Sequence, residues 1–152
     1  MNASIVCVGR LKEKWQRDGV EEYLKRLSRY GKYEIREVDD RPDALGAKAA
    51  EREGEAILKR IRLGEHVVAL AIDGPAPDSP GLARLVDRWA REHGRATLVI
   101  GGSNGLSKEV LERADEKLSF SNLTFPHGLM RVVLLEQLYR AERILANEPY
   151  HK

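Results

Sequence analysis

The chain has 152 residues, of which 42% are hydrophobic and 33% are charged, and its formal net charge is +2. This size and composition suit one globular domain, residues 1–152, and exclude a disordered chain. The longest apolar run, residues 67–72, is too short to cross a bilayer, so we expect no membrane partner. The single cysteine, Cys7, excludes an internal disulfide and a cysteine-built metal site, and it fits a cytoplasmic compartment. The small net charge means that any nucleic-acid contact must come from local clusters.

The first half of the chain predicts two strands and two helices. Residues 4–9 are rich in β-branched side chains and predict a buried strand, and alternation over residues 32–38 predicts a second one. Between them, the spacing i, i+3, i+4, i+7 of apolar residues predicts an amphipathic helix that carries Val20, Tyr23, Leu24 and Leu27. A charged helix is expected over residues 44–62.

The second half predicts three strands and three helices. The strands are expected at residues 66–72, 97–100 and 117–121. Ser79 followed by Pro80 is typical of a helix start, and Ser107 is expected to cap a short helix that ends near residue 114. A long apolar helix over residues 129–145 follows. Alternating strands and helices predict an α/β fold, a mostly parallel sheet with helices on both faces.

Three loops of the second half follow strands, namely residues 73–77, 101–105 and 121–126. Ligands of open parallel sheets bind beyond the carboxyl ends of the strands, so these loops predict one shared site. For any single loop the alternative remains that its glycines only turn the chain. The order of the glycines matches neither a dinucleotide fingerprint nor a P-loop, and no serine-hydrolase or zinc motif is present.

The histidines allow two interpretations. His66 and His93 flank secondary structure and indicate structural roles, and His127 more naturally orients the start of the last helix than transfers a proton. His151 lies in the terminal segment Pro149–Lys152. This segment is either a frayed end or, with its aromatic ring and cation, a group that stacks on a base and contacts phosphate.

Four segments together resemble one family, the ribosomal large-subunit pseudouridine N3-methyltransferase H family of the SPOUT (trefoil-knotted) superfamily. They are Ile100–Leu106, Leu118–His127, Glu136–Ala141 and Pro149–His151, and the likeness covers the whole chain. The resemblance implies a homodimer with a C-terminal trefoil knot, no metal, and transfer of a methyl group from S-adenosylmethionine to N3 of a pseudouridine in 23S rRNA.

The resemblance also implies the residues of the site. The donor is expected to contact Leu70, Gly102, Ser121, Asn122, Leu123, Thr124, Phe125 and Pro126. A side chain at Gly102 is expected to come between the backbone and this ligand. His151 is expected to orient the base or take its proton, because histidine titrates near physiological pH, and Tyr150 is expected to stack beside it.

On the RNA side, Arg131, Arg140 and Lys152 are expected to contact phosphates. For the two arginines, an ion pair with Glu136 or with a partner subunit is an equal alternative. The basic residues of the N-terminal helix are diluted by acidic ones and indicate a solvated face. Two other functions remain open: a related knotted methyltransferase that acts on tRNA, and a ribosome-associated RNA-binding protein without catalysis.

Overall fold

A computed structural model describes all residues, 1–152. Its five strands form one sheet in the order β2-β1-β4-β3-β5, and every neighbouring pair is parallel. The strands are β1 (Asn2–Val8), β2 (Tyr33–Val38), β3 (Val67–Leu70), β4 (Arg95–Ile100) and β5 (Glu116–Leu118). The expected α/β fold with a parallel sheet is therefore confirmed.

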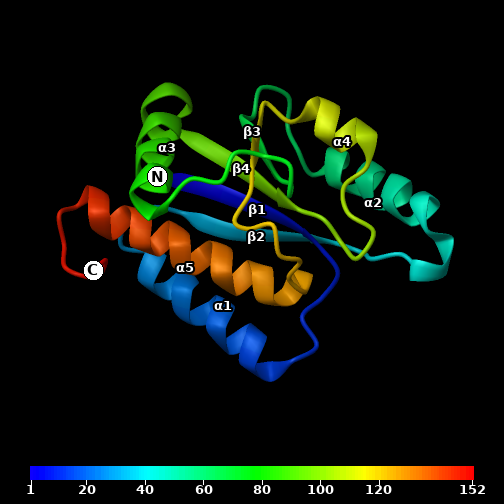
Figure 1. The fold of residues 1–152 in the computed structure, drawn as a ribbon, viewed down its shortest axis with the longest axis horizontal. Coiled ribbons are helices and arrows are strands. Elements are labelled where there is room, and N and C mark those ends of the chain that lie inside the picture. The colour runs from blue at the N-terminus through cyan, green and yellow to red at the C-terminus, as the bar shows by residue number, and fades with distance from the viewer.

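Helices cover both faces of the sheet (Figure 1). The helices are α1 (Lys14–Leu27), α2 (Ala47–Lys59), α3 (Ser79–His93), α4 (Lys108–Arg113) and α5 (His127–Leu145), and a short 3-10 helix, η1, spans Asp43–Leu45. α5 packs against both α1 and α3 on one face, and α2 packs against α4 on the other. The result is a three-layer arrangement with the sheet in the middle.

The sheet divides the apolar core into two clusters, because alternate strand residues point to opposite faces. Ile5, Leu98 and Leu118 join the larger cluster with the inner faces of α1, α3 and α5. Val6, Val67 and Val99 join the smaller one with Ile57 of α2. Cys7 belongs to the larger cluster, and burial raises the pKa of its thiol to about 12, so it serves as a small apolar side chain.

Several element boundaries differ from the expected ones. The N-cap of α3 is Asp78 and not Ser79, since its carboxylate accepts the Gly81 amide at 2.7 Å. The helix expected over residues 44–62 is split, because Gly46, with φ +55°, separates η1 from α2. The last strand ends at Leu118, so Ser119 and Phe120 belong to the loop that follows. Ser107 does cap α4, as expected.

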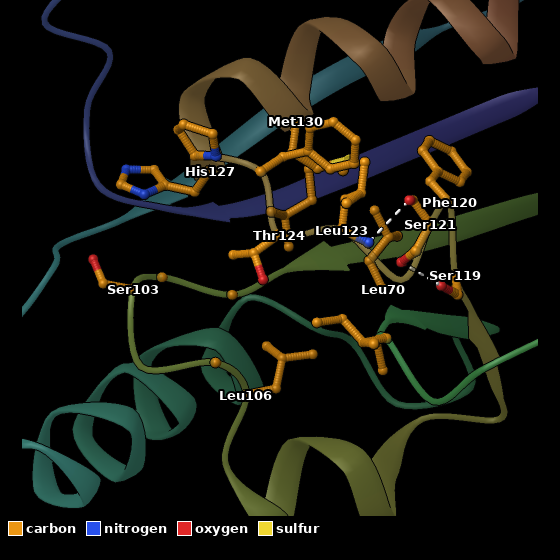
Figure 2. Close-up of a pocket in the computed structure, with 18 of the residues that line it drawn as sticks. Leu70, Ser103, Leu106, Ser119, Phe120, Ser121, Leu123, Thr124, His127 and Met130 are labelled. Atoms are coloured by element: carbon orange, nitrogen blue, oxygen red, sulfur yellow. Dashed lines mark hydrogen bonds between the residues drawn. The ribbon is translucent and has the colours of Figure 1, made fainter.

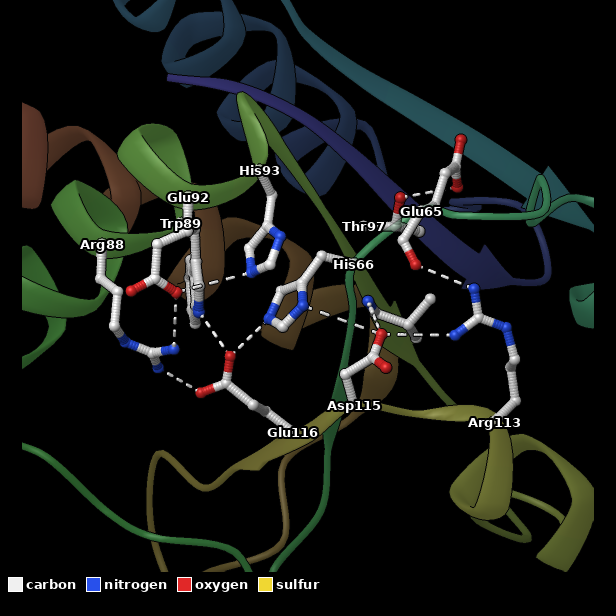
Figure 3. Close-up of polar contacts among 11 residues, drawn as sticks. Glu65, His66, Arg88, Trp89, Glu92, His93, Thr97, Arg113, Asp115 and Glu116 are labelled. Carbon is white, nitrogen blue, oxygen red and sulfur yellow. Dashed lines mark hydrogen bonds and ion pairs between the residues drawn. The ribbon is translucent and has the colours of Figure 1, made fainter.

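The amino-terminal edge of the sheet is held by a polar network of charged and aromatic side chains (Figure 3). Glu116, at the start of β5, accepts hydrogen bonds from Trp89 and Arg88 of α3 and lies 2.5 Å from His66. The ring of His66 stacks on His93 with centroids 4.0 Å apart. This network joins α3, β3 and β5 at the edge opposite the loops expected to bind a ligand.

No helix has both the length and the apolar character needed to cross a membrane.

Candidate functional site

A cavity of about 850 Å³ lies at the carboxyl edge of β4, β3 and β5. These three strands are neighbours in the sheet, so the segments that follow them lie side by side. The walls come from residues 70–72, from residues 100–103, 105 and 106 at the glycine loop, from residues 118–121 and 123–126, and from the first turn of α5 (Figure 2). Its volume falls in the range of small-molecule sites, roughly 300–1,000 Å³.

The loop after β5 is shaped by its own serines. The Ser119 hydroxyl donates to the Ser121 carbonyl at 3.1 Å, and the Ser121 hydroxyl accepts the Leu123 amide at 2.9 Å. Figure 2 shows both bonds beside the cavity. The loop is joined to the segment after β3, because the Ala71 amide donates to the Leu118 carbonyl and the Ser119 amide donates to the Pro75 carbonyl. Two walls of the cavity therefore hold each other in place.

The same loops offer polar backbone groups without partners. The amides of residues 120–122, 124 and 125 donate no hydrogen bond within the chain, and neither do those of residues 103 and 104 in the glycine loop. Backbone donors and acceptors on apolar walls are typical of sites that read the edge of a heterocycle. The apolar wall is supplied by aliphatic and aromatic side chains, which include Leu70, Leu106, Phe120, Leu123 and Met130.

The cavity brings together most of the residues expected to contact the donor. Leu70, Gly102, Ser121, Leu123, Thr124, Phe125 and Pro126 all line it, whereas Asn122 does not. Asp73 lies outside it as well and pairs with Lys117 at 3.2 Å. Sequence reasoning missed Ile72, Leu106 and Phe120. Ile72 and Phe120 each lie two residues beyond the end of a strand, and that position was the signal available for them.

Gly102 is constrained by the protein beneath the loop and not by the cavity alone. A Cβ at this position would lie 3.1 Å from both Glu53 Oε1 and Val8 Cγ1. Glu53 is buried, and its other oxygen accepts the Arg41 amide at 2.9 Å. A side chain at Gly102 would therefore require Glu53 and Val8 to shift by a few tenths of an ångström. That it would also come between the backbone and a ligand stays a prediction.

The residues expected to act on the base lie outside the cavity. Tyr150 packs edge-to-face on Tyr139, with centroids 4.8 Å apart, and its hydroxyl donates to Glu136 at 3.0 Å. Burial, together with Tyr23 and Glu136, raises the pKa of Tyr150 above its usual value, so the phenol keeps its proton. His151 is exposed, and its Nδ1 lies 3.3 Å from Arg140.

The three cations expected to contact RNA differ in placement. Arg131 is 1% exposed, pairs with Glu37 at 2.7 Å and donates to the carbonyls of Val8 and Gly9, so it cannot reach RNA in this conformation. The expectation that Arg131 contacts RNA is therefore corrected. The Glu37 carboxylate and the two carbonyls offset the cost of burying its charge. Arg140 does form the ion pair with Glu136. Lys152 is exposed at the end of the chain.

Comparison with known proteins adds independent information. The family model described as a predicted SPOUT methyltransferase matches residues 1–151. Ribosomal RNA large subunit methyltransferase H of Bifidobacterium animalis subsp. lactis (strain AD011) is 53% identical over 160 aligned residues, and that of Clostridioides difficile (strain 630) is 51% identical over 159. Each alignment covers 100% of both chains.

Among solved structures, a probable methyltransferase from Bordetella pertussis Tohama I has a TM-score of 0.59 at 15% identity. The match covers 93% of this chain and 96% of that one. A probable methylase family protein from Haemophilus influenzae Rd KW20 has a TM-score of 0.56 at 17% identity, over 99% of this chain and 70% of that one. At such low identity these two matches support the fold alone.

Proposed function

The chain belongs to the SPOUT methyltransferase family as a ribosomal RNA large subunit methyltransferase of the H type, and from this we propose that it methylates N3 of a pseudouridine in 23S rRNA. The methyl donor is S-adenosylmethionine, as methyltransferase chemistry implies. The observation that carries the assignment of the site is the cavity at the edge of β4, β3 and β5, walled by apolar side chains and by backbone amides without partners.

The cavity fits such a donor in size and chemistry. When bound, S-adenosylmethionine supplies a methyl carbon activated by a sulfonium. Leu70 and Leu123 would form apolar walls, and the free amides of the loop after β5 would hydrogen-bond the adenine edge. In methyl transfer the protein contributes mainly by positioning, and fixing two reactants in line is worth roughly 7–11 kcal/mol.

We also propose that the active form is a homodimer in which the tail of one copy completes the cavity of the other. Within one chain, Tyr150 contacts Glu136 of α5. The helix begins at the cavity with His127, so at about 1.5 Å per residue Glu136 lies roughly 14 Å further along its axis. Neither Tyr150 nor His151 lines that cavity. If the tail acts on the base that receives the methyl group, it must do so across two chains.

Apolar side chains without a partner in the chain support the dimer. Leu129 and Val133 lie one turn apart on α5 and are half-buried, yet they join neither core cluster. Ile72, at the cavity, is 56% exposed. A second copy that covered these side chains would bury the same surface of each chain, as a two-fold interface requires.

We propose in addition that the chain after β5 forms the trefoil knot of the superfamily. β5 lies at the edge of the sheet, and the chain must return from it to α5, which packs between α1 and α3. The segment after β3 is tied to this return by the Ala71–Leu118 and Ser119–Pro75 backbone bonds. A trefoil knot requires a loop that is fixed at both ends, through which the rest of the chain passes.

On the RNA side, we propose Arg140 and Lys152 as phosphate contacts, since Lys152 is exposed at the end of the tail and Arg140, whose side chain is 24% exposed, lies beside His151. The test of the function is transfer of a labelled methyl group from S-adenosylmethionine to ribosomes, 23S rRNA and tRNA, with the product located by mass spectrometry. Label on N3 of a pseudouridine in 23S rRNA supports the proposal. Label on tRNA would favour the related tRNA enzyme, and RNA binding without label would favour a non-catalytic protein.

A further inference from the structure

One ionisable side chain lines the cavity, and it is His127. The other lining residues are aliphatic, aromatic, glycine, proline, or carry a hydroxyl, so none of them accepts a proton near neutral pH. Figure 2 places His127 at the same end of the cavity as Ser103 of the glycine loop, away from Phe120. The ring therefore lies where the cavity meets the loops that surround its mouth.

The other histidines are engaged elsewhere. His66 Nε2 lies 2.5 Å from Glu116 and its ring stacks on His93, both at the opposite edge of the sheet. His151 has its Nδ1 3.3 Å from the Arg140 guanidinium and does not line the cavity. His127 has no side-chain hydrogen bond of this kind, so a ring nitrogen is free to accept a proton from a ligand.

The position of His127 is fixed by the buried residue one turn further along α5. Arg131 donates to the carbonyls of Val8 and Gly9 at 3.1 and 2.6 Å, which ties the first turn of α5 to the end of β1. His127 Nε2 lies 3.6 Å from the point that a Cβ on Gly9 would occupy. Gly9 has φ +85° and no side chain, so the space in front of the ring stays open.

The charged groups around the ring come from several elements. Asp40, in the segment after β2, has its Cβ and Cγ 3.7 Å from the same point at Gly9. Arg131 lies on the same helix, but its charge is paired with Glu37 of β2. Asp40 is therefore the carboxylate that lies against the same glycine as the His127 ring.

We infer that His127 is a catalytic residue that takes the N3 proton of the target base. The inference rests on the proposed function. The N3–H bond breaks and its proton moves to a free imidazole nitrogen, while the N3 electron pair forms the bond to the methyl carbon. The carbon–sulfur bond breaks with its electrons on sulfur, which leaves a neutral thioether, and the imidazolium then releases its proton to water. His151 is left with orienting the base.

The experiment compares His127→Gln with wild-type protein and with His93→Gln, a matched change at the opposite edge of the sheet. Single-turnover methyl transfer to the rRNA substrate is followed between pH 5.5 and 9.5, with donor affinity measured by calorimetry on the same samples. His127→Gln should lower the rate about 10²–10⁴-fold and leave the donor Kd within about threefold. The wild-type rate should rise through the range in which a histidine titrates, and this inflection should vanish in the variant.

A smaller side chain gives a second readout that a structural role would not produce. His127→Ala should recover part of the lost rate when imidazole is added, while His93→Gln should behave as wild type throughout. A His127→Gln protein that methylates at the wild-type rate with the wild-type pH profile would overturn the inference, as would loss of donor binding equal to the loss of rate. A wild-type protein that methylates no RNA would instead contradict the proposed function.

Discussion

Arg131 of α5 and Glu37 of β2 form an ion pair of 2.7 Å between residues 94 positions apart in the chain. The arginine is 1% exposed, whereas the glutamate side chain is 41% exposed. The same guanidinium donates to the carbonyls of Val8 and Gly9, where β1 ends. One buried cation therefore joins α5 to two strands directly beside the first turn of α5, which lines the cavity.

Removing this arginine should destabilise the fold. Arg131→Ala leaves two buried carbonyls without donors and removes the partner of Glu37, so we expect a loss of about 3 kcal/mol or more in urea unfolding. Glu37→Gln is the matched change on the exposed side of the pair and should cost no more than about 1 kcal/mol. If Arg131→Ala leaves stability unchanged and weakens RNA binding, Arg131 would be an RNA contact and not a structural residue.

The donor site should be sensitive to charge at Leu123. This residue lines the cavity but is 69% exposed, so Leu123→Asp should fold normally and still weaken S-adenosylmethionine binding about tenfold or more, because an apolar wall of the cavity is lost. Leu63→Asp is the control, since Leu63 is fully exposed and lies outside the cavity. Equal donor affinity in both variants by calorimetry would contradict the site.

The tail should act across the dimer. A chain lacking residues 150–152 should bind the donor but not methylate, since these residues do not line the cavity. Leu123→Asp keeps the tail, but its own cavity should bind the donor weakly. Dimers assembled from one chain of each kind contain one intact cavity beside one intact tail, so mixing should restore activity that neither variant has alone. Light scattering should give twice the 17.2 kDa chain mass. Full activity of the truncated protein would make the tail an ordinary chain end.

The network at the amino-terminal edge should make stability depend on pH. Burial opposes ionisation of Glu116, but hydrogen bonds from Arg88, His66 and Trp89 outweigh it and lower the pKa of this carboxyl. Its stabilisation is therefore present above the ordinary glutamate pKa of about 4.3 and is lost as the pH falls through the lower folded value.

Glu116→Gln should accordingly cost about 1–2 kcal/mol at pH 7 in urea unfolding, and this difference should shrink below about pH 4. Glu92→Gln, at a half-exposed and loosely paired carboxylate, should change stability little at any pH. A Glu116→Gln effect that does not vary between pH 3.5 and 7.5 would show that packing, and not charge, holds the network.

The sequence by itself determined the elements and their order, because the information is local. The apolar run before the glycine loop, the Ser107 cap and the helix that follows Pro126 all depend on residues close in the chain. The motifs of residues 100–106 and 118–127 also directed attention to the loops that line the cavity. Where the local signal was ambiguous, as at Asp78 and Ser79, the boundary was wrong by one residue.

Only the tertiary structure decided which side chains meet. Arg131 and Arg140 are equivalent in the sequence, two arginines on one helix, yet the first is buried against β1 and β2 while the second lies beside the tail. The two histidines also differ from what the sequence predicted, since His127 lines the cavity and His151 does not. These outcomes depend on strand order and on contacts more than 100 residues apart, such as that between Arg131 and Gly9. Periodicity reports which face of an element is buried, but not which distant residue lies against it.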